Sequence, residues 1–348
     1  MDEHRPRRAA PRDRDRPGAD PGPGARGPGA DHRGVPAVTA PTVAVVGAIT
    51  RDDIETPAAA REELGGSAVY AALAAALLGP VQIVSVVGDD APLWWLERMA
   101  GRGIDVSGVR VVPGATFHWG CRYRANLEDR DTLFVHPGVF DDTPIVAPRD
   151  TAGVAHLFLS SSVAAQNRAA MAAYRDRRLT MLDTIEREIV QARAGLLETI
   201  AEVDVVSINE AEARMLLGVE GPLARAEVAT RTLAMLREWG AETLLLKHGP
   251  DGITLADAGG LRSVAAARAD QVTDPTGAGD VFGGAALAAL AAGASLEEAA
   301  RWGSATASFV VEAFGAARLW EIDRADVERR VAALPAATPL PAAGSAVP

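Results

Sequence analysis

Residues 274–284, with the sequence DPTGAGDVFGG, constrain the fold of this chain more than any other stretch. An alanine-rich run follows them as far as Ala292 and has the composition of a helix. We therefore expect the loop 276–279 directly ahead of a helix, with Asp280 in its first turn. Small residues allow backbone N–H groups to approach an anion closely, and the unpaired amides at a helix start favour negative charge.

A carboxylate beside such an anion-binding loop is the local equipment for phosphoryl transfer to a hydroxyl group. We predict that Asp280 stays ionised and can accept a proton next to a bound phosphate. The alternative interpretation is a flexible glycine-rich turn that ends in a helix-capping aspartate. The residues elsewhere in the chain decide between these two.

Short apolar runs and helical segments alternate along most of the chain. The runs have strand length and are rich in branched side chains, and segments of helical composition follow them. This alternation predicts right-handed β-α-β units and an α/β fold, with a mostly parallel sheet covered on both faces. The expected strands are 42–47, 81–87, 156–160, 179–183, 203–208 and 243–247, and the expected helices are 68–78, 93–100, 164–176, 189–200, 211–217 and 279–292.

One region interrupts this alternation. Residues 109–112, 116–125 and 131–136 have the pattern of successive strands, with turn residues and no helix between them. They predict a small β-sheet inserted at about residues 108–137. Such a sheet would be either a lid over the active site or a surface hairpin without a functional role.

Polar residues follow several of the expected strands. Because the carboxyl ends of parallel strands open into one crevice, we expect these side chains to converge there. Acidic and amide oxygens suit a Mg²⁺–nucleotide complex, since Mg²⁺ takes oxygen ligands and often keeps water between itself and the protein. Asn209 equally fits a helix N-cap, and Glu210 and Glu212 fit first-turn acids. The residues concerned are 50–53, Asp183, 209–212 and 247–249.

A second glycine-rich loop precedes the expected helix 68–78. Gly65, Gly66 and Ser67 form either a site where the backbone can approach a polar ligand closely or a plain loop in which Ser67 caps the helix.

Other motifs are missing from the sequence. It has no G-x-x-x-x-G-K-[ST] loop, no G-x-G-x-x-G after the first strand and no G-x-S-x-G nucleophile elbow, and the serines at 160–162 have no evident histidine partner.

Composition and charge exclude further classes of protein. The 348 residues carry a formal net charge of −11 without a basic stripe interleaved with aromatic residues, which argues against nucleic acid as a partner. The single cysteine, Cys121, rules out an internal disulfide framework, suggests a reducing compartment and fits a small buried apolar residue. No apolar run approaches the ~20 residues of a membrane-spanning helix, and the N-terminus lacks a signal-peptide core. We therefore expect a cytoplasmic protein without a membrane partner.

The two ends of the chain differ in composition from the middle. Residues 1–40 are rich in Arg, Pro, Gly and Asp and have almost nothing to bury, which predicts a disordered N-terminal extension. Residues 335–348, rich in Ala and Pro, predict a flexible tail. Residues 41–334 then form one domain that contains the lid segment.

These motifs together resemble the ribokinase-like carbohydrate kinases of the PfkB family. Segment 274–284 resembles the C-terminal signature of that family, and LGGSAVYAALAAALLG at 64–79 resembles its Gly-Gly substrate motif and helix. Other similar elements are GAITRD at 47–52, VVGDD at 86–90, SINEAEARMLLG at 207–218, which matches the N-x-x-E motif, and LLLKHGPDGITL at 244–255. The resemblance covers about residues 42–319 and implies a ribokinase-like three-layer sandwich with a β-sheet lid.

The resemblance also implies an activity. The chain would be a phosphotransferase that moves the γ-phosphate of ATP to an alcohol group of a sugar or sugar-like small molecule. Asp280 would be the general base that takes the proton of the acceptor. Gly277, Ala278 and Gly279 would form the anion hole for charge that develops on the transferred group.

The same resemblance implies the remaining site residues. Asn209 and Glu212 would organise Mg²⁺, directly or through water. Asp274 and Thr276 match positions that bind a monovalent cation, such as K⁺, in some members of the family. The implied acceptor-binding residues are Asp52, Gly65, Gly66, Ser67, Tyr70, Arg122 and Tyr123, and the implied nucleotide-binding residues are Asn209, Glu212, Lys247, Gly249, Gly252, Thr276, Gly277 and Gly279.

Several positions depart from the common family pattern. Tyr70 and Thr50 each stand where many members have asparagine, and Lys247 and Pro275 each stand where many have threonine. Because Tyr70 could stack on a base or pack against a ring, a nucleoside kinase and a cyclitol (inositol-like) kinase are alternatives to a sugar kinase. A non-catalytic sugar- or nucleotide-sensing protein on the same fold is an alternative of a different class.

The lid segment leaves two further alternatives open. Arg122, Tyr123, Arg124 and Asp131 either reach the substrate or pair with one another on the lid surface. The lid itself either covers the site of its own chain or also joins two copies into a homodimer.

Overall fold

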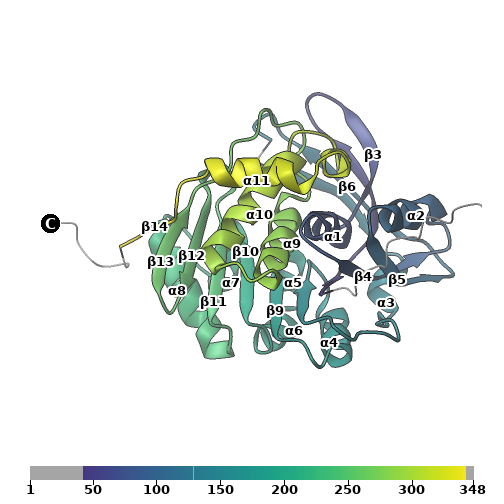
Figure 1. Ribbon diagram of the computed structural model, residues 1–348, viewed down its shortest axis with the longest axis horizontal. Helices are drawn as coiled ribbons and strands as arrows, with labels where there is room; N and C mark the ends of the chain where they lie inside the picture. The colour runs from purple at the N-terminus through teal and green to yellow at the C-terminus, as the bar shows by residue number, and fades with distance from the viewer. Residues whose placement is uncertain (1–41, 128, 342–348) are drawn as a thin grey trace, which may run out of the picture. The chain divides into compact units, whose positions relative to one another are not determined.

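A computed structural model of the protein describes residues 42–127 and 129–341. The predicted disordered extension 1–40 and the end of the predicted tail, 342–348, lie outside the described residues. Within the described ranges, ten strands form one large sheet and four form a small one (Figure 1). In the order in which they lie side by side, the strands of the large sheet are β14 (Thr338–Pro339), β13 (Gly260–Val264), β12 (Ile253–Asp257), β11 (Thr243–Lys247), β10 (Val205–Asn209), β9 (Leu179–Asp183), β8 (His156–Leu159), β1 (Val43–Val46), β4 (Val81–Gly88) and β5 (Ile104–Val112).

The direction of these strands confirms the predicted mostly parallel sheet. All strands from β11 to β5 run parallel to their neighbours, whereas β12, β13 and β14 are antiparallel. All six predicted strands of the sheet are present, with ends that differ by at most two residues. The carboxyl ends of the parallel strands therefore meet along one edge, which we call the carboxyl edge.

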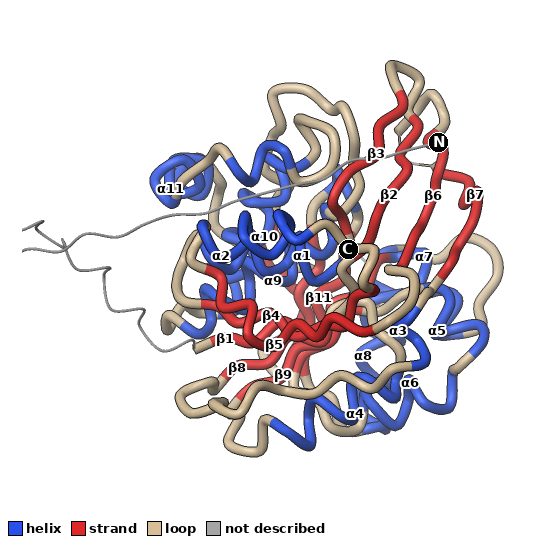
Figure 2. The backbone as a smooth tube through the Cα atoms, turned by 90° about the vertical axis from the view of Figure 1, so that its right-hand side faces the viewer, coloured by secondary structure: helices blue, strands red, loops and turns tan. Residues whose placement is uncertain are grey.

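Helices cover both faces of the large sheet, as Figure 2 shows. On β1, Val43 and Val45 belong to one apolar core and Ala44 and Val46 to the other, because alternate side chains point to opposite faces. The first core contains α1 (Ser67–Ala76), α2 (Leu93–Gly101), α9 (Ala278–Ala291), α10 (Leu296–Val310) and α11 (Arg324–Ala333). The second contains α4 (Ala164–Ala173), α5 (Glu186–Gln191), α6 (Arg193–Ile200), α7 (Glu210–Leu217) and α8 (Arg225–Trp239).

Two glycines of the DPTGAGDVFGG segment allow α9 to lie directly on its neighbours. A Cβ atom on Gly283 would lie 2.3 Å from the ring of Phe158 on β8, and one on Gly284 would lie 2.2 Å from the carbonyl oxygen of Ala71 on α1. Contacts this short are not tolerated, so any larger residue would push α9 away from the sheet. These glycines therefore fix the position of the helix that carries the predicted catalytic aspartate.

The small sheet differs from the predicted lid. Its strands lie in the order β3 (Ala60–Gly65), β2 (Thr50–Glu55), β6 (Phe117–Tyr123) and β7 (Arg130–His136), and Figure 2 shows them extending from the layered core. Residues 109–112 are not part of it, because they belong to β5 and pair with β4 in the large sheet. This small sheet, which we call the lid after its predicted role, is thus built from two segments, 50–65 and 117–136, in place of the single predicted segment 108–137.

Three smaller predictions also need correction. The helix predicted at 189–200 is two helices, α5 and α6, separated by Ala192. Helices α3 (Val139–Asp142), α8, α10 and α11 were not predicted. The tail was expected to be loose from residue 335, but Thr338 and Pro339 pair with β13 at the edge of the large sheet. Across the described ranges, no helix has both the length and the apolar character needed to cross a membrane.

Candidate active site

Residues 276 and 277 lead directly into α9, so the predicted loop 276–279 includes the first two residues of the helix, and Asp280 lies in its first turn, as predicted. Gly277 is the N-cap residue and has left-handed backbone angles, with φ 77° and ψ 0°. A Cβ atom at Gly277 would also lie 2.4 Å from the ring of Tyr70. Glycine is therefore required here both for the backbone conformation and for the close approach.

The Asp274 side chain holds this loop in position through hydrogen bonds to the backbone. Its carboxylate is buried, and one oxygen accepts a hydrogen bond from the backbone N–H of Thr276 at 2.9 Å. The other oxygen accepts from the N–H of Gly315 at 2.8 Å. Both oxygens are thus engaged by backbone donors, and a monovalent cation at Asp274 and Thr276 would have to share them.

Asp280 is half-buried among charged groups from three other elements. Burial and the nearby carboxylate of Asp183 raise the pKa of Asp280 to about 7, and the ammonium of Lys247 only partly offsets this. The expectation of a fully ionised Asp280 considered only the helix dipole. Desolvation and like charge outweigh that dipole in this environment.

Lys247 and Asp183 form a buried ion pair at the ends of β11 and β9. The Lys247 Nζ atom lies 2.7 Å from both carboxylate oxygens of Asp183. Burial disfavours the ammonium, but the carboxylates of Asp183 and Glu212 outweigh it and raise the pKa of Lys247. A Cβ atom at Gly279 would lie 3.1 Å from Nζ, so the cation rests against the predicted anion-binding loop.

Asn209 and Glu212 cap α7 and also face this cluster. The Asn209 side chain accepts from the N–H of Glu212 at 2.9 Å, and the Glu212 carboxylate accepts from the N–H of Asn209 at 3.4 Å. The N-cap interpretation is therefore confirmed. The same carboxylate accepts a 2.8 Å hydrogen bond from the Thr184 hydroxyl, and burial raises the pKa of Glu212 to about 7. Glu212 therefore caps α7 and also belongs to the charged cluster with Lys247 and Asp183.

Asp52 lies on the lid strand β2, close to the glycine-rich loop. It is buried and accepts a 2.5 Å hydrogen bond from the Thr50 hydroxyl, and burial raises its pKa to about 7. A Cβ atom at Gly65 would lie 1.8 Å from the Asp52 carboxylate, which explains the glycine at that position. Gly66, with φ 97°, precedes α1, and the Ser67 hydroxyl donates to the carbonyl oxygen of Ser160 at 3.4 Å.

Tyr70 and Arg122, two of the predicted acceptor-binding residues, lie in different surroundings. Tyr70 is 1% exposed and its ring lies under Gly277, with Asp52 and Asp280 among the charged groups that act on its hydroxyl, so its contact with the acceptor stays a prediction. Arg122 forms an exposed ion pair with Glu55 on the side of the lid opposite to its neighbour Tyr123, so its predicted contact is wrong. Tyr123 does reach the site, because its hydroxyl lies 3.1 Å from the Thr276 hydroxyl.

The turn predicted to lie beside the nucleotide connects β11 and β12. It contains the 3₁₀ turn η1 (Gly249–Asp251) and Gly252, whose φ is 93°. The preceding His248 is held on both ring nitrogens, by Glu210 at 2.8 Å and by the Thr254 hydroxyl at 2.9 Å. These contacts fix the turn in position. Gly249 is exposed in it, whereas Gly252 is buried.

Sequence reasoning missed Thr184 and Ser161. The Ser161 hydroxyl donates to the Asp280 carboxylate at 3.4 Å, and its backbone has a positive φ of 20°. Thr184 directly follows β9, and Ser161 lies two positions after the end of β8. The same rule that selected Asp183 would have found them.

The donor atoms at the carboxyl edge suit Mg²⁺ in kind. Asn209 and Glu212 offer the amide and carboxylate oxygens that this ion prefers. Among the residues that the structure describes, no three acidic, histidine or cysteine side chains gather closely enough to hold a metal on their own. A bound Mg²⁺ would therefore need water or phosphate oxygens as further ligands.

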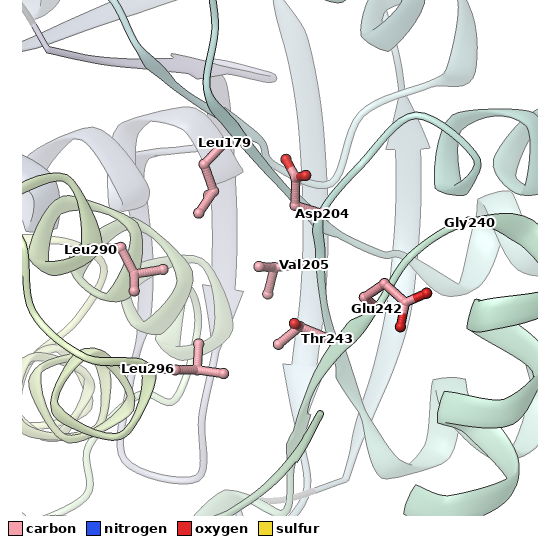
Figure 3. Close-up of a pocket in the computed structure, with 8 residues that line it drawn as sticks. All are labelled: Leu179, Asp204, Val205, Gly240, Glu242, Thr243, Leu290 and Leu296. Atoms are coloured by element: carbon pink, nitrogen blue, oxygen red, sulfur yellow. The ribbon is translucent and has the colours of Figure 1, made fainter. Parts of the chain in front are cut away.

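A separate hollow of about 310 Å³ lies at the opposite edge of the sheet (Figure 3). It is lined by Leu179, Val205 and Thr243, the first residues of β9, β10 and β11, and by Leu290 and Leu296. Its walls are mainly apolar. Because the charged cluster lies at the other ends of these strands, the hollow is not part of the candidate active site.

Comparisons with known proteins agree with this geometry. The profile of the pfkB family carbohydrate kinases matches residues 39–323. The cytidine kinase of Thermococcus kodakarensis is 31% identical over 281 residues, which are 78% of this chain and 96% of the relative. The ribokinase of Haemophilus influenzae is 28% identical over 272 residues, which are 72% of this chain and 82% of the relative.

Solved structures show the same fold. The structure of Arabidopsis thaliana ribokinase complexed with ribose and ATP superposes with a TM-score of 0.70, at 23% sequence identity. The match covers 84% of this chain and 99% of that chain. It confirms the predicted three-layer α/β architecture.

Proposed function

Since this chain belongs to the PfkB family of carbohydrate kinases, and so is a phosphotransferase that acts on an alcohol group, we propose that it transfers the γ-phosphoryl group of ATP to a hydroxyl of a nucleoside. The observation that carries this proposal is the convergence of groups from α9, β11 and α7 at the carboxyl edge. They bring together the loop 276–279, Asp280, Lys247 and Glu212.

Asp280 is the general base in this proposal. The acceptor hydroxyl gives its proton to the Asp280 carboxylate while its oxygen forms a bond to the γ-phosphorus, and the bond from phosphorus to the ADP oxygen breaks. A base with a pKa of about 7 is well matched to neutral pH. The Ser161 hydroxyl, which donates to the ionised form, holds the carboxylate in position.

The loop and Lys247 stabilise charge on the transferred group. Gly277, Ala278 and Gly279 are the N-cap and the first two residues of α9, where unpaired amides and the helix dipole favour an anion. The Lys247 ammonium adds positive charge beside Gly279. Mg²⁺, which Asn209 and Glu212 would hold through water, would supply further charge neutralisation. Phosphoryl transfer depends mainly on such positioning and electrostatics.

Asp52 is the proposed hydroxyl-binding residue for the acceptor. It lies on the lid strand β2, next to Gly66. Its buried carboxylate can accept hydrogen bonds from the hydroxyl groups of a sugar. A nucleoside is the first candidate because the cytidine kinase matches over nearly its whole length, at 31% identity. A free pentose is the second candidate because the ribokinase also matches over most of its length.

An acceptor screen tests this function. Purified protein with Mg·ATP is assayed for ADP release on nucleosides, pentoses, hexoses and inositols, and we expect turnover on a nucleoside first. Asp280→Asn should lower that turnover by about 10²–10⁴ while ATP binding persists. Protein that binds ATP but releases no acceptor-dependent ADP would favour the sensing alternative, and an unchanged rate in the variant would remove Asp280 from the role of base.

A further inference from the structure

Three consecutive serines, residues 160–162, follow the carboxyl end of β8 beside the candidate active site. The Ser160 hydroxyl donates to the carbonyl oxygen of Val46 on β1 at 2.8 Å, so it joins two neighbouring strand ends. The Ser162 hydroxyl is buried and has no partner among the described residues. Ser161 differs from both neighbours because its hydroxyl reaches the predicted catalytic aspartate.

The backbone of Ser161 adopts a conformation that suits glycine better than serine. Its φ angle is 20°, and across the described ranges Leu127 is the one other residue besides glycine that has a positive φ. Such a conformation costs free energy for a residue with a side chain, and it persists where the surrounding structure requires it. Glycine at 161 would avoid this strain. What serine offers there, and glycine lacks, is a hydroxyl group.

That hydroxyl lies between two hydrogen-bond acceptors. It reaches the Oδ1 atom of Asp280 at 3.4 Å and the carbonyl oxygen of Thr184 at 3.5 Å. A serine hydroxyl has one hydrogen to donate. An ionised carboxylate is a stronger acceptor than a carbonyl oxygen, whereas a neutral carboxyl group is not. The hydrogen bond from Ser161 to Asp280 therefore favours the ionised aspartate, which is the form that accepts a proton.

The other groups that face Asp280 act on it through charge. They are Lys247 on β11, Asp183 on β9, Glu212 on α7 and Tyr70 on α1. The Lys247 ammonium already has a partner, because it lies 2.7 Å from both carboxylate oxygens of Asp183. In the part of the chain that the structure describes, Ser161 is thus the side chain that donates a hydrogen bond to Asp280, and the Oδ2 atom of Asp280 accepts none.

We propose that Ser161 is a positioning residue whose hydroxyl binds Oδ1 of Asp280 and so directs Oδ2 toward the acceptor hydroxyl. The acceptor proton moves to Oδ2 as the acceptor oxygen bonds to the γ-phosphorus, and Ser161 keeps its own proton. Once Asp280 is neutral, the Thr184 carbonyl competes for the Ser161 hydroxyl. This role rests on the proposed kinase function and deepens it, because it assigns the atom of the base that takes the proton and explains the strained serine.

Unfolding measurements test the hydrogen bond without a known acceptor. Ser161→Ala removes the hydroxyl and keeps the strain, whereas Ser161→Gly removes both. Losing a donor to the ionised carboxylate raises the folded-state pKa of Asp280, so stability continues to fall at higher pH. We expect the urea midpoints of both variants to drop further between pH 5 and pH 8 than that of the wild type, with Ser161→Gly the more stable of the two. Ser162→Ala is the control and should follow the wild type.

Turnover tests the role in the reaction on an acceptor from the screen described above. At pH 7 we expect kcat to fall about 10-fold in both Ser161→Ala and Ser161→Gly, as for one lost hydrogen bond to a charged group, while KM for ATP stays unchanged. The midpoint of the pH–rate profile should move to higher pH. In an Asp280→Asn background the same substitutions should have no further effect, because Ser161 acts through that carboxylate.

Several results would overturn this role. One is an unchanged kcat in Ser161→Ala, and another is a kcat lost in Ser161→Ala but kept in Ser161→Gly, which would assign the effect to the backbone. A full further loss in the Asp280→Asn background, or urea midpoints of Ser161→Ala that parallel the wild type, would do the same. If Ser161→Ala does not fold, Ser161→Gly decides by these comparisons. A wild type without acceptor-dependent ADP release refutes the kinase function itself, and the unfolding measurements still decide whether the hydrogen bond exists.

Discussion

Replacing Asp280 by asparagine should stabilise the protein at neutral pH while it removes turnover. Burial raises the pKa of Asp280 from an ordinary value of 3.8 to about 7. That change corresponds to at most about 4 kcal/mol of unfavourable free energy for the ionised carboxylate in the folded state. An asparagine side chain cannot ionise, so Asp280→Asn avoids this cost. The side chain keeps nearly the same shape, which limits other effects on packing.

The sign of the pH dependence follows from the same shift. Between pH 3.8 and about 7 the folded state holds the Asp280 proton more tightly than the unfolded state does. Stability of the wild type therefore falls as pH rises through this window and levels off above it. The stabilisation by Asp280→Asn should grow by about 2 kcal/mol between pH 5 and pH 7 and then level off.

Urea unfolding of the wild type and of Asp280→Asn at pH 5, 6, 7 and 8 measures this difference. Asp131→Asn, at an exposed position of β7 in the lid, is the control. Asp131 forms hydrogen bonds with Arg124 that lower its pKa, so this variant should not gain stability as pH rises. A difference between wild type and Asp280→Asn that does not change with pH would refute the reasoning, because it would mean that Asp280 is ionised throughout.

Three further outcomes can be measured directly. Wild-type turnover should rise with pH to a plateau above about 7, because only ionised Asp280 accepts the proton; a pH–rate profile checks this. Gly277→Ala should lower the free energy of unfolding by about 1–3 kcal/mol, since its backbone has φ 77° and the added Cβ meets the Tyr70 ring; urea unfolding measures it. Lys247→Met should destabilise by about 3–5 kcal/mol because Asp183 is left buried and unpaired, and adding Asp183→Asn should restore part of that loss.

The core of the fold and the loop before α9 could be predicted because their signals are local. The strands at 43–46 and 81–88 are rich in branched apolar side chains and are buried on both faces, and the small residues at 276–279 lead into a helix. In each case the residues that give the sequence pattern lie within the strand or turn that the pattern predicts. Periodicity and turn chemistry are then sufficient.

The predicted strands 116–125 and 131–136 are present as β6 and β7, but β2 was not predicted, and residues 109–112 of β5 were assigned to the small sheet. β2 alternates buried Thr50, Asp52 and Ile54 with partly exposed charged residues, so its composition resembles that of a loop. β5 is the outermost parallel strand of the large sheet, and its exposed side carries polar residues such as Asp105 and Arg110. It therefore looks like a strand of a small solvated sheet. Edge position and polar lining both weaken the apolar signal that a strand prediction uses.

The remaining site contacts depend on tertiary structure. Asp183 and Lys247 are 64 positions apart, and only their place at neighbouring strand ends brings them together. The sequence of the lid hairpin offered several arginines, but only the register of β6 and β7 shows that Arg130 shares a face of the sheet with Tyr123 and that Arg122 lies on the opposite face. No spacing along the chain carries that information.

The burial of Cys121 has a practical consequence. It is the single thiol of the chain, and it lies fully covered beside Ile54 and Tyr123 in the small apolar cluster of the lid. Burial raises its pKa to about 12, so the closed arrangement keeps it unreactive. A thiol-directed dye would thus label native protein only during moments when the lid interior opens. The rate of Cys121 labelling therefore measures how often the lid interior opens. A nucleotide or acceptor that holds the lid closed should slow this labelling.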